Sequence, residues 1–174
     1  DKVDENIARV NLKTTWNAAK GSNLADFTIK TEIKDAQGKV VASSSDKLSK
    51  FDQSLFEQTY AVAKPNLWSP ESPYLYTANS TIYQGEKVKD TYTTRFGIRT
   101  IEIIPNKGFF LNGKMVKFKG VCNHHDLGPL GAAVNKAAIR RQIKMMKDMG
   151  VNAIRTSHNM PAPEFVEACD EMGM

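Results

Sequence analysis

Cysteine is scarce in this sequence, and long apolar segments are missing from it. Its two cysteines, Cys122 and Cys169, form neither a CxxC pair nor a metal-ligand spacing, so we expect reduced, buried thiols rather than a disulfide framework. No apolar run approaches the roughly 20 residues of a membrane-spanning helix. The first five residues carry no basic and apolar leader. These absences favour a globular chain without a membrane partner.

Acidic residues are outnumbered by basic ones, and the formal net charge is +5. Much of the surplus falls in one stretch with helical spacing, at Lys136, Arg140, Arg141, Lys144 and Lys147. This stretch is either a nucleic-acid patch or the solvated face of an amphipathic helix. No aromatic residues interleave with these charges, and no nucleic-acid motif accompanies them. We therefore interpret the stretch as a solvated face and expect no nucleic-acid partner.

The first 95 residues consist of short alternating segments rich in β-branched and aromatic residues. They predict strands at Ile7–Thr15, Asp26–Lys34, Lys39–Ser45, Leu55–Val62, Tyr74–Tyr83 and Lys87–Arg95. Turn residues such as Gln84-Gly85-Glu86 separate the segments. Six or seven short strands at this spacing predict an immunoglobulin-like β-sandwich, although the Cys…Trp…Cys pattern of antibody domains is missing.

After Arg95 the pattern changes to alternating strands and helices. A β-pair is predicted at Thr100–Ile104 and Phe109–Leu111, followed by the hairpin signal Asn112-Gly113. The remaining elements are a strand at Val116–Cys122, a helix at Lys136–Met149, a strand at Val151–Arg155 and a helix from Pro163 to Gly173. This order, with short connections, predicts a parallel α/β unit.

Caps and apolar spacing support both helices. Asn135 is suited to cap the start of the first helix, and Gly150 to end it. The buried faces are predicted from residues at helical spacing: Ile139, Ile143 and Met146 in the first helix, and Phe165, Cys169 and Met172 in the second.

All three histidines follow the two predicted parallel strands, His124 and His125 after the first and His158 after the second. In parallel α/β folds, the loops at the C-terminal ends of strands form the active site. The same loops carry further polar residues, namely Asn123, Asp126, Arg155, Ser157 and Asn159. The alternative interpretation is that the histidines and these polar residues are ordinary loop and capping residues without a functional role. We favour a functional site because two separate loops bring every histidine to one face.

Three kinds of chemistry fit this group. His124, Asp126 and His158 would form a two-histidine, one-carboxylate metal site, although such a pattern is common by chance. Nucleophilic catalysis is disfavoured, because Ser157 lacks a G-x-S-x-G elbow and Cys122 ends a strand. The third is recognition of a hydroxyl-rich ligand by neutral donors and acceptors, with catalytic carboxylates elsewhere.

Long motifs in both halves resemble family 2 glycoside hydrolases. They are Trp68–Tyr76, Phe96–Arg99, Asn112–Lys114, Phe118–Asp126, Met145–Lys147, Gly150–His158, Pro161 and Cys169–Gly173. The resemblance implies an immunoglobulin-like β-sandwich over residues 1–95, followed over residues 96–174 by an incomplete α/β TIM barrel, the N-terminal part of a (β/α)₈ catalytic domain. It also implies a bacterial β-galactosidase acting on terminal β-D-galactose, or a β-glucuronidase or β-mannosidase, in the cytoplasm or periplasm.

The resemblance also assigns roles to single residues. His124 and His158 match histidines that contact the sugar, and Asp126 and Asn123 are expected in the same substrate site. Arg155 matches an arginine that lies under the catalytic nucleophile and keeps it ionised, as a guanidinium beside a carboxylate does. The chain departs from the commonest family pattern at Cys122, Asn123 and His125, which leaves the preferred sugar open.

The family mechanism retains configuration and uses two glutamates about 5 Å apart. The resemblance places both on later barrel strands, so we expect no catalytic carboxylate in this chain. We interpret the glutamates of the last helix, Glu164, Glu167 and Glu171, as solvated. No metal or cofactor is expected in the chain, and its partner is a β-galactoside. The incomplete barrel leaves apolar side chains that face its interior without partners, namely Phe118, Val121, Ala153 and Ile154. We therefore expect either self-association through residues after Arg95 or local disorder there, with a well-ordered sandwich.

Overall fold

The chain divides into two structural units. The computed structural model describes residues 6–18, 23–50 and 55–174. One unit comprises the chain up to residue 66 together with residues 75–98, and the other comprises residues 67–74 and 99–174. The segment Leu67–Tyr74 therefore lies within the sequence of the first unit but belongs structurally to the second. None of the helices in the described ranges is both long and apolar enough to cross a membrane.

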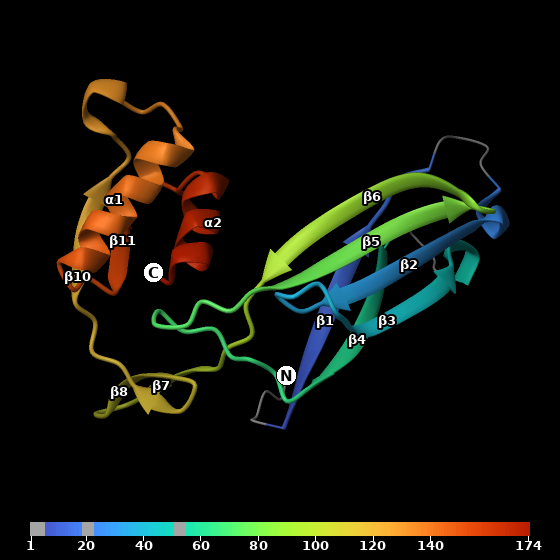
Figure 1. Ribbon diagram of the computed structural model, residues 1–174, viewed down its shortest axis with the longest axis horizontal. Helices are drawn as coiled ribbons and strands as arrows, with labels where there is room; N and C mark the ends of the chain where they lie inside the picture. The colour runs from blue at the N-terminus through green and yellow to red at the C-terminus, as the bar shows by residue number, and fades with distance from the viewer. Residues whose placement is uncertain (1–5, 19–22, 51–54) are drawn as a thin grey trace. The chain divides into compact units, whose positions relative to one another are not determined.

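The first unit is a β-sandwich of two antiparallel sheets (Figure 1). The four-stranded sheet has the order β3-β2-β5-β6, from β2 (Phe27–Lys34), β3 (Val40–Lys47), β5 (Tyr76–Gln84) and β6 (Lys87–Phe96). The other sheet pairs β1 (Ile7–Thr15) with β4 (Leu55–Ala63). Short 3₁₀ helices, Leu24–Asp26 (η1) and Leu48–Lys50 (η2), lie between strands. The sequence prediction of a sandwich is confirmed.

Alternate residues of these strands point into the space between the sheets. Ile29 and Ile33 of β2 are buried there, as are Phe56 and Tyr60 of β4. Ile29, Leu48 and Phe56 form one apolar cluster to which both sheets contribute. Ser44 and Tyr60 are paired in this interior, since Ser44 Oγ lies 2.7 Å from the Tyr60 hydroxyl. Such pairing offsets the cost of removing polar groups from water.

The second unit begins with a small antiparallel sheet of β7 (Ile101–Ile104), β8 (Gly108–Leu111) and β9 (Lys114–Met115). Leu111 pairs with Lys114 around Asn112 and Gly113, whose φ angles are 51° and 74°. The two-residue turn predicted from Asn-Gly is confirmed, because that turn requires positive φ at both positions. The Asn112 side chain also accepts from the Thr100 amide and donates to the Trp68 carbonyl, both at 2.9 Å.

A strand–helix–strand–helix unit follows. β10 (Gly120–His124) and β11 (Ala153–Ser157) pair in parallel. Between them lie a 3₁₀ turn, η3 (Gly128–Leu130), and α1 (Lys136–Asp148), and α2 (Pro163–Met172) comes after β11. The helices α1 and α2 pack side by side (Figure 1). This is the opening of the TIM barrel expected from the sequence. The Asn135 side chain accepts from the Ala138 amide at 3.0 Å, which confirms the predicted cap.

Both parallel strands lie further along the chain than the predicted ranges Val116–Cys122 and Val151–Arg155. Asn152 explains the shift of the first strand. Its side chain accepts from the Lys119 amide at 2.8 Å and donates to the Lys117 carbonyl at 3.1 Å. These backbone groups therefore bond to a side chain rather than to a strand. His124 and Ser157 therefore end β10 and β11 instead of standing in loops.

Side chains alternate along β10 and β11, so this pair of strands has two faces with different side chains. Ile154 packs against the buried residues Ile139 and Ile143 of α1, so the prediction that it faces the barrel interior is wrong. Val121, its partner in β10, shares that face, and the same prediction fails for it. Cys122 and Arg155 occupy the opposite face and are exposed. Cys122 is thus not a buried thiol as predicted, although both cysteines are free.

Candidate functional site

His124, Arg155 and His158 come together at the C-terminal ends of β10 and β11. The rings of His124 and His158 meet edge to face, with 6.1 Å between their centroids and 89° between their planes. Nη2 of Arg155 lies 3.4 Å from Nδ1 of His158. A guanidinium only donates hydrogen bonds, so Nδ1 is the acceptor and the proton of the neutral imidazole is on Nε2. His158 therefore offers an N–H donor at the site.

Two further side chains support Arg155. Its Nη1 donates to Ser157 Oγ at 3.2 Å and lies 4.0 Å from Cys122 Sγ. Ser157 is only 5% exposed, so it is a fixed anchor. A guanidinium has five donors in a rigid fork, and these contacts orient its plane while leaving donors for a carboxylate. Sequence reasoning placed Ser157 among the polar residues of the site and considered Ser157 and Cys122 as weak nucleophile candidates, but it did not predict their contacts with Arg155. The alternation of side chains along each strand could have identified both residues, because it places Cys122 on the same face as His124 and Ser157 on the same face as Arg155.

The other predicted site residues do not join this cluster. Asn123 alternates with His124 along β10 and so lies on the opposite face of the strand. Asn123, His125 and Asp126 line a separate cavity of about 40 Å³, together with Leu127 and other apolar residues. That volume is large enough for one or two water molecules and too small for a sugar. The structure thus brings three of the five predicted residues together.

The alternative metal set is not assembled. His124 and His158 are neighbours, but Asp126 lies at the small cavity described above. Across residues 6–18, 23–50 and 55–174, no group of three histidine, cysteine, aspartate or glutamate side chains is placed to hold a metal ion. The donor set of a two-histidine, one-carboxylate centre is therefore not present at this site.

The glutamates of α2 lie away from the cluster, as part of the surface of the helix pair. Glu167 pairs with Lys136 at 3.7 Å, and Glu171 pairs with Arg140. Both contacts run between α2 and α1. These carboxylates bind helix partners rather than facing His124 and His158.

Two family models together match all of the chain except residues 100 and 101. Residues 1–99 match Glycosyl hydrolases family 2, and residues 102–174 match Glycosyl hydrolases family 2, TIM barrel domain. A protein named β-galactosidase from Bacteroides ovatus is 45% identical over 173 residues, which cover 98% of this chain and 20% of that protein. A protein named β-glucuronidase from Bacteroides fragilis is 31% identical over 176 residues, covering 99% of this chain and 25% of that protein.

Solved structures agree with these matches. A glycosyl hydrolase family 2 member from Bacteroides cellulosilyticus superposes with a TM-score of 0.85 at 34% identity, covering 98% of this chain and 22% of that one. A β-glucuronidase from Parabacteroides merdae superposes with a TM-score of 0.83 at 29% identity, covering 97% of this chain and 21% of that one. This chain thus spans between a fifth and a quarter of the length of these proteins.

Proposed function

Since this chain belongs to family 2 of the glycosyl hydrolases, we propose that the longer polypeptide carrying it is a retaining glycosidase that removes terminal β-linked galactose. One observation carries the proposal. Two independent strands place His124, Arg155 and His158 in a single cluster at their C-terminal ends. In a barrel, that end of the strands carries the active site.

The chemistry that this cluster supports is recognition and electrostatic positioning. Neutral imidazoles donate and accept hydrogen bonds as sugar hydroxyls do. Arg155, oriented by Ser157 and His158, is suited to hold a carboxylate in its ionised form, because a neighbouring cation lowers a carboxyl pKa. We propose that this carboxylate is the nucleophile and that it lies outside residues 1–174.

In the proposed reaction, the nucleophilic carboxylate forms an ester bond to the anomeric carbon, and the glycosidic C–O bond breaks. A second carboxylic acid protonates the departing oxygen. The same group, now a carboxylate, then takes a proton from water as the water oxygen attacks the anomeric carbon. The bond from that carbon to the nucleophile breaks and frees the nucleophilic carboxylate, so the sugar leaves with retained configuration. Within this chain, His124 and His158 would bind the sugar. Asn123 and Asp126 stay predictions as sugar contacts.

A β-glucuronide is the second candidate substrate, because relatives carry that name as well. A glucuronide bears a carboxylate, which a binding site matches with a cation. Within the described part of the chain, the cation at the cluster is Arg155, and it already contacts Ser157 and His158. Because we propose that the remaining donors of Arg155 hold the nucleophile, they are not available to a glucuronide, and the cluster fits a neutral sugar better.

The test compares p-nitrophenyl β-galactoside, β-glucuronide and β-mannoside as substrates of the longer polypeptide. We expect the galactoside to be cleaved fastest and the 174-residue chain to cleave none of them. His158→Ala should abolish cleavage, whereas His125→Ala, on the other face of the strand end, should retain it. Faster cleavage of the glucuronide would overturn the galactoside assignment. Turnover that scales with the concentration of repurified 174-residue chain would overturn the placement of the carboxylates.

A further inference from the structure

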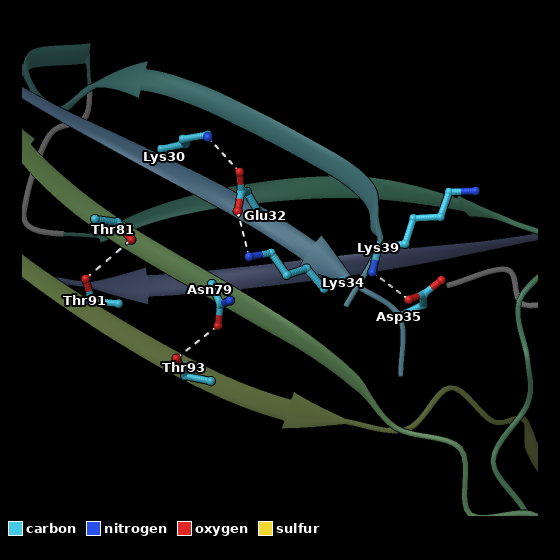
Figure 2. Close-up of polar contacts among 9 residues, drawn as sticks. All are labelled: Lys30, Glu32, Lys34, Asp35, Lys39, Asn79, Thr81, Thr91 and Thr93. Atoms are coloured by element: carbon cyan, nitrogen blue, oxygen red, sulfur yellow. Dashed lines mark hydrogen bonds and ion pairs between the residues drawn. The ribbon is translucent and has the colours of Figure 1, made fainter. Parts of the chain in front are cut away.

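Polar side chains on the outer face of the four-stranded sheet pair with one another. Glu32 of β2 binds Lys30 at 2.6 Å and Lys34 at 3.1 Å (Figure 2). Thr93 of β6 donates to the Asn79 side chain of β5 at 3.0 Å (Figure 2). An antiparallel sheet commonly has one polar face in water. No ligand is needed to explain the polar residues of this surface, whereas exposed apolar residues of the second unit do call for a partner.

Met160 is an apolar side chain beside the cluster of His124, Arg155 and His158. It follows His158 by two residues, so the Cα atoms of the two residues are at most about 7 Å apart. Met160 is 91% exposed, although large apolar side chains gain stability when they leave water. Exposed apolar surface marks a binding site where it adjoins a few polar groups that fix the orientation of a ligand.

A second loop brings further apolar side chains to this end of the strands. Leu130 and Val134 lie between β10 and α1 and are 46% and 49% exposed. Their loop meets the loop of Met160, because Val134 and Ala162 line the same small cavity. Ala162 follows Met160 by two residues, just as Met160 follows His158. These three exposed apolar side chains therefore lie on the two loops that border the polar cluster.

Hydrogen bonds hold the first of these loops in a defined shape. The Leu127 amide donates to the Gly131 carbonyl at 2.8 Å, and the Gly131 amide donates to the Gly128 carbonyl at 2.9 Å. Gly128 and Gly131 have φ angles of 62° and 57°, which glycine adopts without strain. Leu127 packs against the buried cluster between α1 and α2. The backbone thus buries Leu127 and leaves Leu130 exposed.

We propose that Met160, with Leu130 and Val134, forms the subsite for the leaving group of the substrate, and that this group presents an apolar face. An aromatic ring and the C–H face of a sugar ring both offer such a face. The inference rests on the proposed function, in which the departing galactose occupies the polar cluster, so the group across the scissile bond lies next to it. Methionine is flexible and polarisable and makes favourable sulfur contacts with aromatic rings, so Met160 can adapt to leaving groups of different shape.

A loop from another part of the longer polypeptide is the alternative partner of Met160. If such a loop covered Met160, its truncation would disturb the whole site and slow the cleavage of every substrate alike. A contact with the leaving group has a different consequence, because only substrates that carry a large leaving group would be affected. Substrates with and without such a group therefore distinguish the two.

Steady-state kinetics of the longer polypeptide provide the test. We expect Met160→Ala to lower kcat/KM about tenfold for p-nitrophenyl β-galactoside, lactose or both, because an apolar contact with the leaving group is lost. For β-galactosyl fluoride, whose leaving group is a single atom, kcat/KM should change little. Met160→Leu should restore most of the loss, since it keeps an apolar side chain. Met149→Ala is the matched control. Met149 is 72% exposed, but it lies at the far end of α1, about 20 Å along the helix from Val134, and its loss should affect no substrate.

The pattern of losses identifies the leaving group and decides the proposal. A loss on the nitrophenyl galactoside alone would indicate an aromatic leaving group, and a loss on lactose would indicate a sugar ring. Equal losses on these substrates and on the fluoride would overturn the proposal, as would no loss on any of them. If the unmodified polypeptide cleaved no β-galactoside at all, the proposed function would fail instead, and this inference with it.

Discussion

The indole Nε1–H of Trp68 donates to the main-chain carbonyl of Asp170 at 2.8 Å. The contact joins the segment Leu67–Tyr74 to α2 within the second unit. Trp68 is only 4% exposed, and the guanidinium of Arg99 lies 4.8 Å from the centre of its ring. A stretch of sequence that sits between two sandwich strands is therefore a packed part of the barrel opening.

Replacing Trp68 by phenylalanine should destabilise the second unit by about 2 kcal/mol. The change removes a buried hydrogen bond and leaves a small void. Trp16→Phe is the matched control, because the Trp16 Nε1–H has no acceptor to lose, and it should cost less than about 1 kcal/mol. Urea unfolding followed by circular dichroism measures both, at the helix band for the second unit and at the strand band for the sandwich. Equal losses would mean that the bond to Asp170 contributes nothing.

Gly173→Ala should be strongly destabilising. Gly173 has φ +73°, and an added Cβ would lie 2.3 Å from the Pro70 carbonyl oxygen. Gly150→Ala is the control, since Gly150 also ends a helix with positive φ, +85°, but has open space around its Cβ. We expect a cost of about 1 kcal/mol for Gly150→Ala from backbone strain alone. Gly173→Ala should cost about 2 kcal/mol more from overpacking. Thermal unfolding of the two variants gives the difference, and similar melting temperatures would contradict it.

Lys147→Met should lower the stability of the second unit more than a variant that breaks an exposed ion pair of the same helix. The Lys147 ammonium donates to the carbonyl oxygens of Pro70 at 3.0 Å, of Gly173 at 2.9 Å and of Met172. The sequence interpretation of Lys147 as part of a solvated face is therefore wrong. Its loss should cost about 2 kcal/mol, because charged hydrogen bonds are the stronger ones. Lys144→Met, which breaks an exposed pair with Asp148 on the same helix, should cost about 0.5 kcal/mol or less. The urea midpoints of unfolding of the two variants measure this difference, and equal midpoints would contradict it.

The two thiols should differ in reactivity. Burial, with a smaller effect from Asp170, raises the pKa of the Cys169 thiol from 9.0 to about 11, while Cys122 is exposed. At pH 8, iodoacetamide should modify Cys122 at least about 100-fold faster than Cys169, since the thiolate is the nucleophile. Peptide mass spectrometry gives both rates, and comparable rates would contradict the buried position of Cys169.

The same shift predicts how stability depends on pH. The protonated thiol is favoured in the folded state, so its contribution is complete below pH 9 and is lost as the pH rises toward about 11. Urea unfolding of the chain and of Cys169→Ala across this range should show a steeper loss in the unmodified chain. Parallel pH profiles would contradict this assignment.

Arg155→Ala, made in the longer polypeptide, should lower kcat about 100-fold with a small change in KM. The proposed partner of Arg155 is the nucleophile rather than the sugar, and an interaction that matters in the transition state appears in kcat. Arg140→Ala is the control, because Arg140 pairs with Glu171 between the two helices. Steady-state kinetics on the nitrophenyl galactoside provide the measurement. A rise in KM alone would make Arg155 a binding residue.

Local patterns were sufficient for most elements and for part of the site. Alternating residues predicted the sandwich strands, Asn112-Gly113 predicted its turn, and Asn135 predicted its cap, because each depends on neighbours within a few residues. The parallel pairing of β10 with β11 could be expected from the strand–helix–strand order, and with it the meeting of His124 with Arg155 and His158.

Other contacts between residues far apart in sequence were decided by the tertiary structure alone. The Asn152 side chain binds the backbone around Lys119, so β10 starts at Gly120 rather than at Val116 as predicted. The docking of Trp68 on α2 joins positions that no periodicity connects. Sequence by itself determined which residues form strands and helices, since those depend on local spacing. Only packing determined which face of each strand is covered, because a covering element comes from elsewhere in the chain.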